Sequence, residues 1–183
     1  NTYSNHKDFD KALELKNELL DIYIGFFGEN HPWCLNIMSD IAMIKSHKGE
    51  YEEAMELLYT VCKKRNELLG KRHLSSIAAL NNFAIVKVFY LESMKEYEDK
   101  EKNLRLALEQ LNEVYEARKE ILGEEHPNTL RTEFNIVKTL NVLNEKEQAL
   151  EKAQKLYEKR KKILGENNAE TIQTKELIEE IKK

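Results

Sequence analysis

The sequence predicts an all-α solenoid of antiparallel helix pairs, and three observations point to that fold class. Related segments follow Gly28, Gly70, Gly123 and Gly165, which lie 42, 53 and 42 residues apart. Between these glycines, apolar residues recur at the spacing of amphipathic helices. Only six glycines and two prolines interrupt the chain. A fixed period within about 20–50 residues is typical of stacked repeats that bury their faces against one another.

The first element, residues 7–27, is predicted to be the second helix of a pair whose first helix does not precede it in this chain. Its apolar side chains are expected to form an exposed face, which comprises Phe9, Leu13, Leu20 and Phe27. An exposed apolar face of this kind invites pairing. A homodimer through this N-terminal helix is therefore one expected mode of association.

Residues 31–69 are predicted to form the first complete pair. Pro32 stands where a first helical turn tolerates proline. The break at 48–50 is so short that the two helices must be antiparallel neighbours. Gly70 is expected to end the second helix, because glycine enters the left-handed region freely.

The later elements align on this pair. Residues 73–122 and 126–164 form the second and third pairs, and residues 168–182 form a closing helix with a polar outer face. A small residue stands sixteen positions before each glycine, and these residues are Ala12, Ala54, Ala107 and Ala149. Small residues there predict helices that cross closely, since larger side chains would overpack. The whole chain, 1–183, is expected to be one repeat domain.

The second pair carries an 11-residue insertion between Ala84 and Ala107. No glycine or proline occurs from 85 to 106, and eleven residues are close to three helical turns. We expect a longer helix pair, with Leu91, Met94 and Tyr97 closing its tip. The alternative is a mobile acidic bulge at 96–99.

Several segments resemble a known family. Tyr51-Glu52-Glu53-Ala54, residues 80–84 (LNNFA) and residues 118–130 (RKEILGEEHPNTL) are similar to tetratricopeptide repeats, in particular the 42-residue kinesin light chain type. The chain departs from that pattern at His73-Leu74 and Asn168-Ala169, where the family has His-Pro. The resemblance implies a right-handed α-solenoid of about eight helices. It also implies that a peptide or partner helix binds in a concave groove lined by the first helix of each pair.

Spacing of i, i+4, i+7 and i+11 on the first helices selects the residues expected to face this groove. They are Asn36, Asp40, Met43 and His47, then Asn82, Ile85 and Phe89, then Arg131, Asn135 and Lys138. Asparagine amides both donate and accept, so a ladder of them could hold a peptide backbone. Arg131 and Lys138 favour an acidic ligand. The side chains that favour an apolar anchor are Met43, Ile85 and Phe89. In the alternative interpretation the asparagines bridge neighbouring helices, and Arg131 pairs with Glu133 or another carboxylate.

Other residue patterns indicate structure rather than chemistry. His31, His73 and His126 share one repeat position and are expected to start helices, not to bind a metal, because stacked units hold them too far apart. Arg65, Arg118 and Arg160 could bind phosphate, but an internal charge pair or a solvated face is the favoured interpretation.

Composition and motifs argue against three classes of function, which are nucleic-acid binding, membrane spanning and catalysis. The net charge of −4 provides no electrostatic case for nucleic acid, and no apolar run approaches the roughly 20 residues of a membrane span. No phosphate loop, zinc-protease or nucleophile-elbow motif occurs, so neither catalysis nor a cofactor is expected.

We therefore expect a non-enzymatic scaffold that binds protein or peptide. The alternative is a sensory or self-association module that docks another domain of the same protein or a second copy. The two isolated thiols, Cys34 and Cys62, suggest a reducing compartment and hence a cytoplasmic location.

Overall fold

The computed structural model describes the backbone of residues 2–95 and 98–183, and the side chains of 8–95 and 98–183. Within these ranges it contains eight α-helices and no strand, as an all-α repeat fold requires. The chain divides into two compact units, Asn1–Ser93 and Met94–Lys183. Each unit holds four of these helices.

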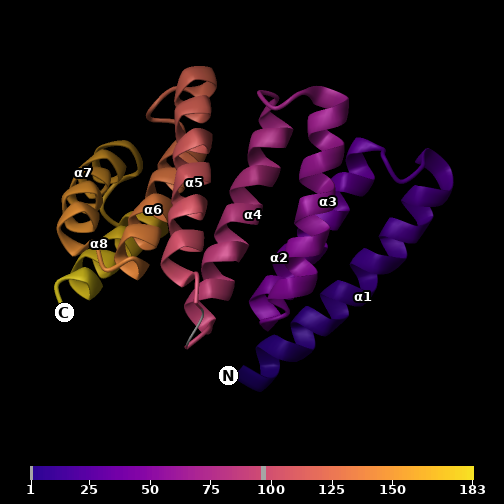
Figure 1. Cartoon of the computed structure of the whole chain (residues 1–183), viewed down its shortest axis with the longest axis horizontal. Helices are drawn as coiled ribbons and strands as arrows, with labels where there is room; N and C mark the ends of the chain where they lie inside the picture. Colours follow the sequence, from indigo (N-terminus) through magenta and orange to yellow (C-terminus); the bar gives the residue numbers. More distant parts are fainter. Residues whose placement is uncertain (1, 96–97) are drawn as a thin grey trace. The chain divides into compact units, whose positions relative to one another are not determined.

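The first unit comprises α1 (Thr2–Phe27), α2 (Pro32–Lys48), α3 (Tyr51–Leu69) and α4 (Leu74–Ser93). Each helix packs on the next, and α2 also packs on α4 (Figure 1). Because the connections are short, consecutive helices are antiparallel. The predicted pair at residues 31–69 corresponds to α2 and α3.

Two clusters of buried side chains form the core between α2, α3 and α4. One consists of Ala42, Ala54, Leu58 and Val86, and the other of Leu35, Val61 and Ala79. Ala54 has no exposed surface, which agrees with a close helix crossing at this position.

The second unit comprises α5 (Lys100–Leu122), α6 (Pro127–Val142), α7 (Lys146–Leu164) and α8 (Ala169–Ile181). Its helices also pack each on the next, and α6 meets α8. Ala107 and Ala149 are fully buried, as the repeat pattern predicts. The pair predicted at 126–164 corresponds to α6 and α7, and the closing helix to α8.

The eleven inserted residues are shared between two helices and their connection. The helix α4 has 20 residues against 17 in α2, and α5 has 23 against 19 in α3. Both helices are longer, as predicted. The boundary between the two units lies inside this predicted pair, so the pairing of α4 with α5 stays a prediction. Tyr97, expected at the tip, lies outside the described residues, as does Glu96 of the alternative bulge.

Helix ends follow a repeated local pattern. The four repeat glycines end helices with positive φ angles of 82° to 94°. At the next helix start, His31 Nδ1 accepts a hydrogen bond from the Trp33 amide, and His126 Nδ1 accepts one from the Asn128 amide. The predicted role of these histidines in starting helices is confirmed.

Three buried arginines bridge successive helices. Arg118 on α5 donates to the Asn128 carbonyl oxygen at 3.0 Å, and Arg65 on α3 donates to the Ser75 carbonyl oxygen at 2.9 Å. Arg160 pairs with Glu170 at 3.2 Å. The interpretation that these arginines lie on a solvated face is therefore wrong, because all three are buried. An internal charge pair is found for Arg160, and backbone carbonyl oxygens supply acceptors that the sequence pattern did not indicate.

Among the described helices, α4 alone is long and apolar enough to cross a membrane by length and composition. Core helices meet the same criterion, and α4 buries Ala79 and Val86 in the two core clusters of the first unit.

Candidate functional site

The predicted face of α2 is polar, and two of its side chains already have partners within the protein. Asn36 Oδ1 accepts a hydrogen bond from Arg65 Nη2 at 2.6 Å. The Asp40 carboxylate pairs with the Lys16 ammonium of α1 at 2.5 Å. Both residues remain exposed, but these contacts match the alternative in which such groups bridge neighbouring helices.

Met43 and His47 continue the same side of α2. The His47 ring is exposed and stacks on Phe9 of α1, with 5.9 Å between ring centroids. Met43 is half-buried and packs against the core cluster that contains Val86 of α4. Met43 is thus the apolar member of this face, and it lies against the core of the first unit.

The predicted residues of α4 form a row that is half-exposed along its length. Asn82, Ile85 and Phe89 are each partly accessible, at i, i+3 and i+7. Asn82 Oδ1 accepts a 3.4 Å hydrogen bond from Asn81. The row combines one amide with two large apolar side chains, and it lies on a helix that packs directly on α2.

The predicted residues of α6 belong to the second unit. Arg131 is exposed and donates to Asn128 Oδ1 at 2.9 Å, while Asn135 and Lys138 are half-buried. Glu133, the expected partner of Arg131, instead accepts from Lys159 of α7 at 3.3 Å. The guanidinium of Arg131 therefore keeps an exposed positive charge on this side of α6.

Lys159 joins two carboxylates that the sequence pattern did not connect. Besides Glu133 it reaches Glu124 at 2.6 Å. Burial acts to lower the pKa of Lys159, but the hydrogen bond to Glu124 and the charge of Glu133 outweigh it, and the pKa is raised. This ion pair network joins α7 to the start of α6, and its two carboxylates share one ammonium group, so it leaves no positive charge for an acidic ligand.

The sequence analysis misplaced the exposed apolar side of α1. Phe9, Leu13 and Leu20 are half-buried, and Tyr23 and Phe27 contact the Trp33 ring of α2. Phe27 is 49% exposed, as predicted. The prediction is wrong for Phe9, Leu13 and Leu20, because they lie on the side that packs on α2. The exposed row instead comprises Leu15, Leu19, Ile22 and Phe26, and their spacing of four, three and four residues was the signal that could have revealed it.

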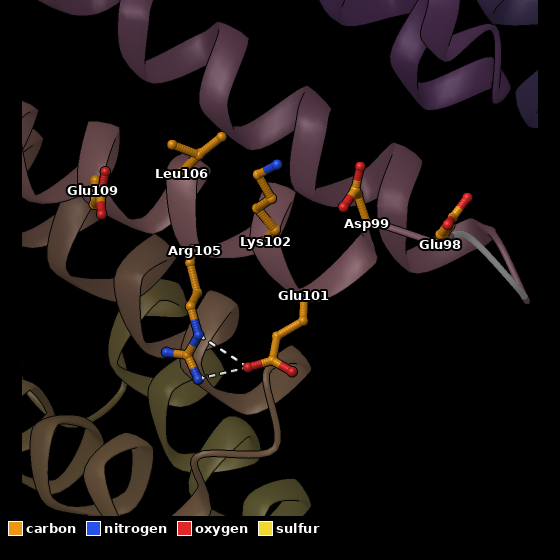
Figure 2. A pocket seen from close by; sticks show the side chains of 7 residues that line it. All are labelled: Glu98, Asp99, Glu101, Lys102, Arg105, Leu106 and Glu109. Carbon is orange, nitrogen blue, oxygen red and sulfur yellow. Dashed lines mark hydrogen bonds and ion pairs between the residues drawn. The ribbon is translucent and has the colours of Figure 1, made fainter.

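Two hollows in the described part of the chain are open to the surface rather than enclosed. A hollow of about 510 Å³ is lined by seven residues from the start of α5 and the two positions before it, and Figure 2 shows Arg105 bonded there to Glu101. Because one short stretch of chain lines it, it is an open surface rather than a pocket. A second hollow of about 440 Å³ lies between α1 and α3, with Ile41 of α2 among its lining residues.

Within the described residues, no three His, Cys, Asp or Glu side chains gather as metal ligands. The two thiols are free. Cys34 is buried and donates to the Gly28 carbonyl oxygen, and burial raises the pKa of Cys62 to about 11. The environment of Cys62 therefore does not activate a thiolate.

Comparison with known proteins identifies the fold. Residues 1–66 match the family model of the tetratricopeptide repeat. The chain has the tetratricopeptide repeat fold. The solved TPR-like repeats of a Podosopora anserina protein described as a putative kinesin light chain superpose with a TM-score of 0.69 at 19% identity. That match covers 98% of this chain and 80% of the other.

A second solved structure, of a variant of the same Podosopora anserina repeats, superposes with a TM-score of 0.63 at 20% identity, over 86% of this chain and 69% of that one. A search of curated proteins finds no significant match. The predicted resemblance to kinesin light chain-like tetratricopeptide repeats is confirmed. Repeats of this family generally mediate protein–protein interaction.

Proposed function

We propose that this tetratricopeptide repeat chain is a non-enzymatic scaffold that binds a peptide segment or a partner helix on the first helices of its repeats. The observation that carries the proposal is the half-exposed row of Asn82, Ile85 and Phe89 on α4. Large apolar side chains at helical spacing provide anchors for a docked segment, and an amide beside them can hold its backbone.

In the first unit the ligand side chain expected at this row is apolar. Met43 of α2, which packs against the core cluster that includes Val86 of α4, contributes a further half-exposed apolar side chain. Asn36 and Asp40 contribute less than an asparagine ladder would, because Arg65 and Lys16 already occupy them. The first unit is therefore proposed to recognise an aliphatic or aromatic anchor.

In the second unit the proposed ligand group is a carboxylate. Arg131 is exposed, and a guanidinium binds a carboxylate through two parallel hydrogen bonds. Lys138 lies seven positions later on the same side of α6, and Asn135 lies between them. Together they favour an acidic segment.

A peptide array probed with the full chain tests the first unit. Ile85→Ser and Asn82→Ala should each weaken the best peptides about tenfold or more. Tyr59→Ser, which removes an exposed side chain from the second helix α3, should leave them unchanged. Peptides that bind all three variants equally would place recognition elsewhere and overturn the proposal for α4.

Charge reversal tests the second unit. The double change Arg131→Glu and Lys138→Glu should abolish binding of acidic peptides, and the loss of wild-type affinity should be steep as salt rises, since exposed charges are screened. Asn135→Ala should weaken the same peptides. Unchanged affinity of the double variant for an acidic peptide would contradict the carboxylate site but leave the α4 row standing.

A further inference from the structure

The helix α1 exposes a continuous row of large apolar side chains. Leu15, Leu19, Ile22 and Phe26 have exposed fractions of 56%, 37%, 54% and 79%. Intervals of four, three and four residues place them along one side of the helix. Single exposed apolar residues are ordinary, but a contiguous row marks an interaction surface.

The repeat itself shows what covers this side of such a helix. With a shift of 42 residues, Leu19 corresponds to Val61 of α3, and Leu15 corresponds to Leu57. Val61 is fully buried in a cluster with Leu35 of α2, and Leu57 packs against the cluster that contains Ala42 of α2. Ile22 and Phe26 correspond to Lys64 and Leu68, and Leu68 is 55% exposed. On α3, therefore, aliphatic and small side chains of α2 and α4 cover the part that corresponds to Leu15 and Leu19, and the part that corresponds to Phe26 stays exposed.

An acidic row runs beside the apolar one. Glu14, Glu18 and Asp21 are exposed and lie at intervals of four and three residues. None of the three forms an ion pair with another described side chain. A covering helix with lysine or arginine along its flank would therefore gain charge pairs at the edge of the apolar contact.

A second copy of this chain fits the surface less well. If two α1 helices paired antiparallel about a two-fold axis, the apolar rows would meet, but each acidic row would face its own counterpart. Like charges placed opposite each other are unfavourable. The charge pattern thus disfavours an antiparallel pair of copies, whereas a different protein can supply the complementary charges.

We propose that the α1 row of Leu15, Leu19, Ile22 and Phe26 is a second protein-binding site, and that it takes a basic amphipathic α-helix of another protein. The helix carries aliphatic residues at the same four-three-four spacing and lysine or arginine on the side that faces Glu14, Glu18 and Asp21. This site is separate from the proposed peptide site on α4.

Two designed helical peptides test the proposal on the full chain. Both carry leucine at the four-three-four spacing, and one has lysine on the flank while the other has glutamate. Measured by calorimetry at low salt, the lysine peptide should bind at least tenfold more tightly. Equal affinity for the two peptides, or no binding of the lysine peptide, would overturn the proposal.

Variants locate the binding. Ile22→Ser and Phe26→Ser remove exposed side chains, so the fold should be kept, and each should weaken the lysine peptide about tenfold. Glu18→Lys should weaken it several-fold. Leu106→Ser on α5, which is similarly exposed, is a control that should leave its affinity unchanged. If Leu106→Ser weakened binding as strongly as Phe26→Ser, the α1 site would be rejected.

The oligomeric state of the chain distinguishes a different protein from a second copy as the partner of the α1 row. Sedimentation should show a chain whose mass does not depend on Phe26. A dimer that becomes a monomer with Phe26→Ser, and that the lysine peptide does not dissociate, would assign the row to a second copy and overturn the proposed partner.

Discussion

The guanidinium of Arg118 on α5 donates a hydrogen bond to Thr132 Oγ1 on α6, with the two atoms 2.7 Å apart. The same arrangement recurs one repeat later, where Arg160 donates to Thr174 Oγ1 at 2.9 Å. Burial lowers the pKa of Arg118 to about 10, with a smaller contribution from the charge of Arg131. Arg118 thus stays charged at neutral pH and fastens one helix to the next.

Replacing this arginine should cost stability. Arg118→Met leaves the Asn128 carbonyl oxygen and Thr132 without their shared donor, and we expect the free energy of unfolding to fall by about 1–3 kcal/mol. Thr132→Val should cost about 1 kcal/mol. Lys119→Met, an exposed control on the same helix, should change it by no more than about 0.5 kcal/mol. Urea denaturation followed by circular dichroism measures all three, and an Arg118→Met variant as stable as the wild type would contradict this role.

The helices could be predicted from the sequence because their ends are set by local chemistry. Glycine after each second helix and His or Asn before each first helix act within a few residues of themselves. The break at Gly49 and the start at Pro32 therefore lie where the pattern put them.

The candidate site was harder to predict because it depends on partners distant in sequence. Thr132 lies fourteen residues after Arg118, but Ala79 lies at that distance from Arg65. Because Ala79 has no hydroxyl group, Arg65 donates to Asn36 Oδ1 instead. Asn36 was predicted to serve a ligand, and only the three-dimensional contact shows that an arginine holds it.

Two helix-ending residues in the first unit should respond differently to asparagine. Gly70 has φ 82° and ψ 157°, a conformation essentially restricted to glycine, so Gly70→Asn should cost about 1–3 kcal/mol. Gly49 has φ 84° and ψ 7°, and Asn144 takes positive φ at the equivalent position of the second unit. Gly49→Asn should therefore be tolerated.

The fluorescence of Trp33, the only tryptophan, reports this comparison within the first unit. A Cβ at Gly70 would meet no atom within 4 Å, so a loss of stability there would come from backbone strain and not from a clash. Equal midpoints for the two variants in urea would reject the assignment.

The histidine that starts α6 should be replaceable by asparagine. Asn168 performs the same task at α8, where its Oδ1 accepts from the Glu170 amide at 2.9 Å. His126→Asn should keep the cap on the Asn128 amide, whereas His126→Ala should cost about 1 kcal/mol. Urea denaturation of the two variants in parallel measures the difference. If the alanine and asparagine variants had the same stability, the hydrogen bond from the Asn128 amide to His126 Nδ1 would contribute nothing to the stability of the fold.

The environment of Cys62 predicts slow thiol chemistry in the folded chain. Burial is the main reason that its pKa is raised from 9.0 to about 11, and the nearby charge of Arg65 only partly offsets it. At pH 8 the thiolate fraction, and with it the rate of disulfide-reagent labelling, should be about a hundredfold below that of an ordinary exposed cysteine. Because the unfolded chain releases this proton at lower pH, the contribution of Cys62 to stability should fall as pH rises from about 9 to about 11. Mass spectrometry of labelled peptides separates Cys62 from the buried Cys34. Labelling in guanidinium should restore the full rate at both thiols, and rapid labelling of Cys62 without denaturant would show that the contact between α3 and its neighbours opens readily.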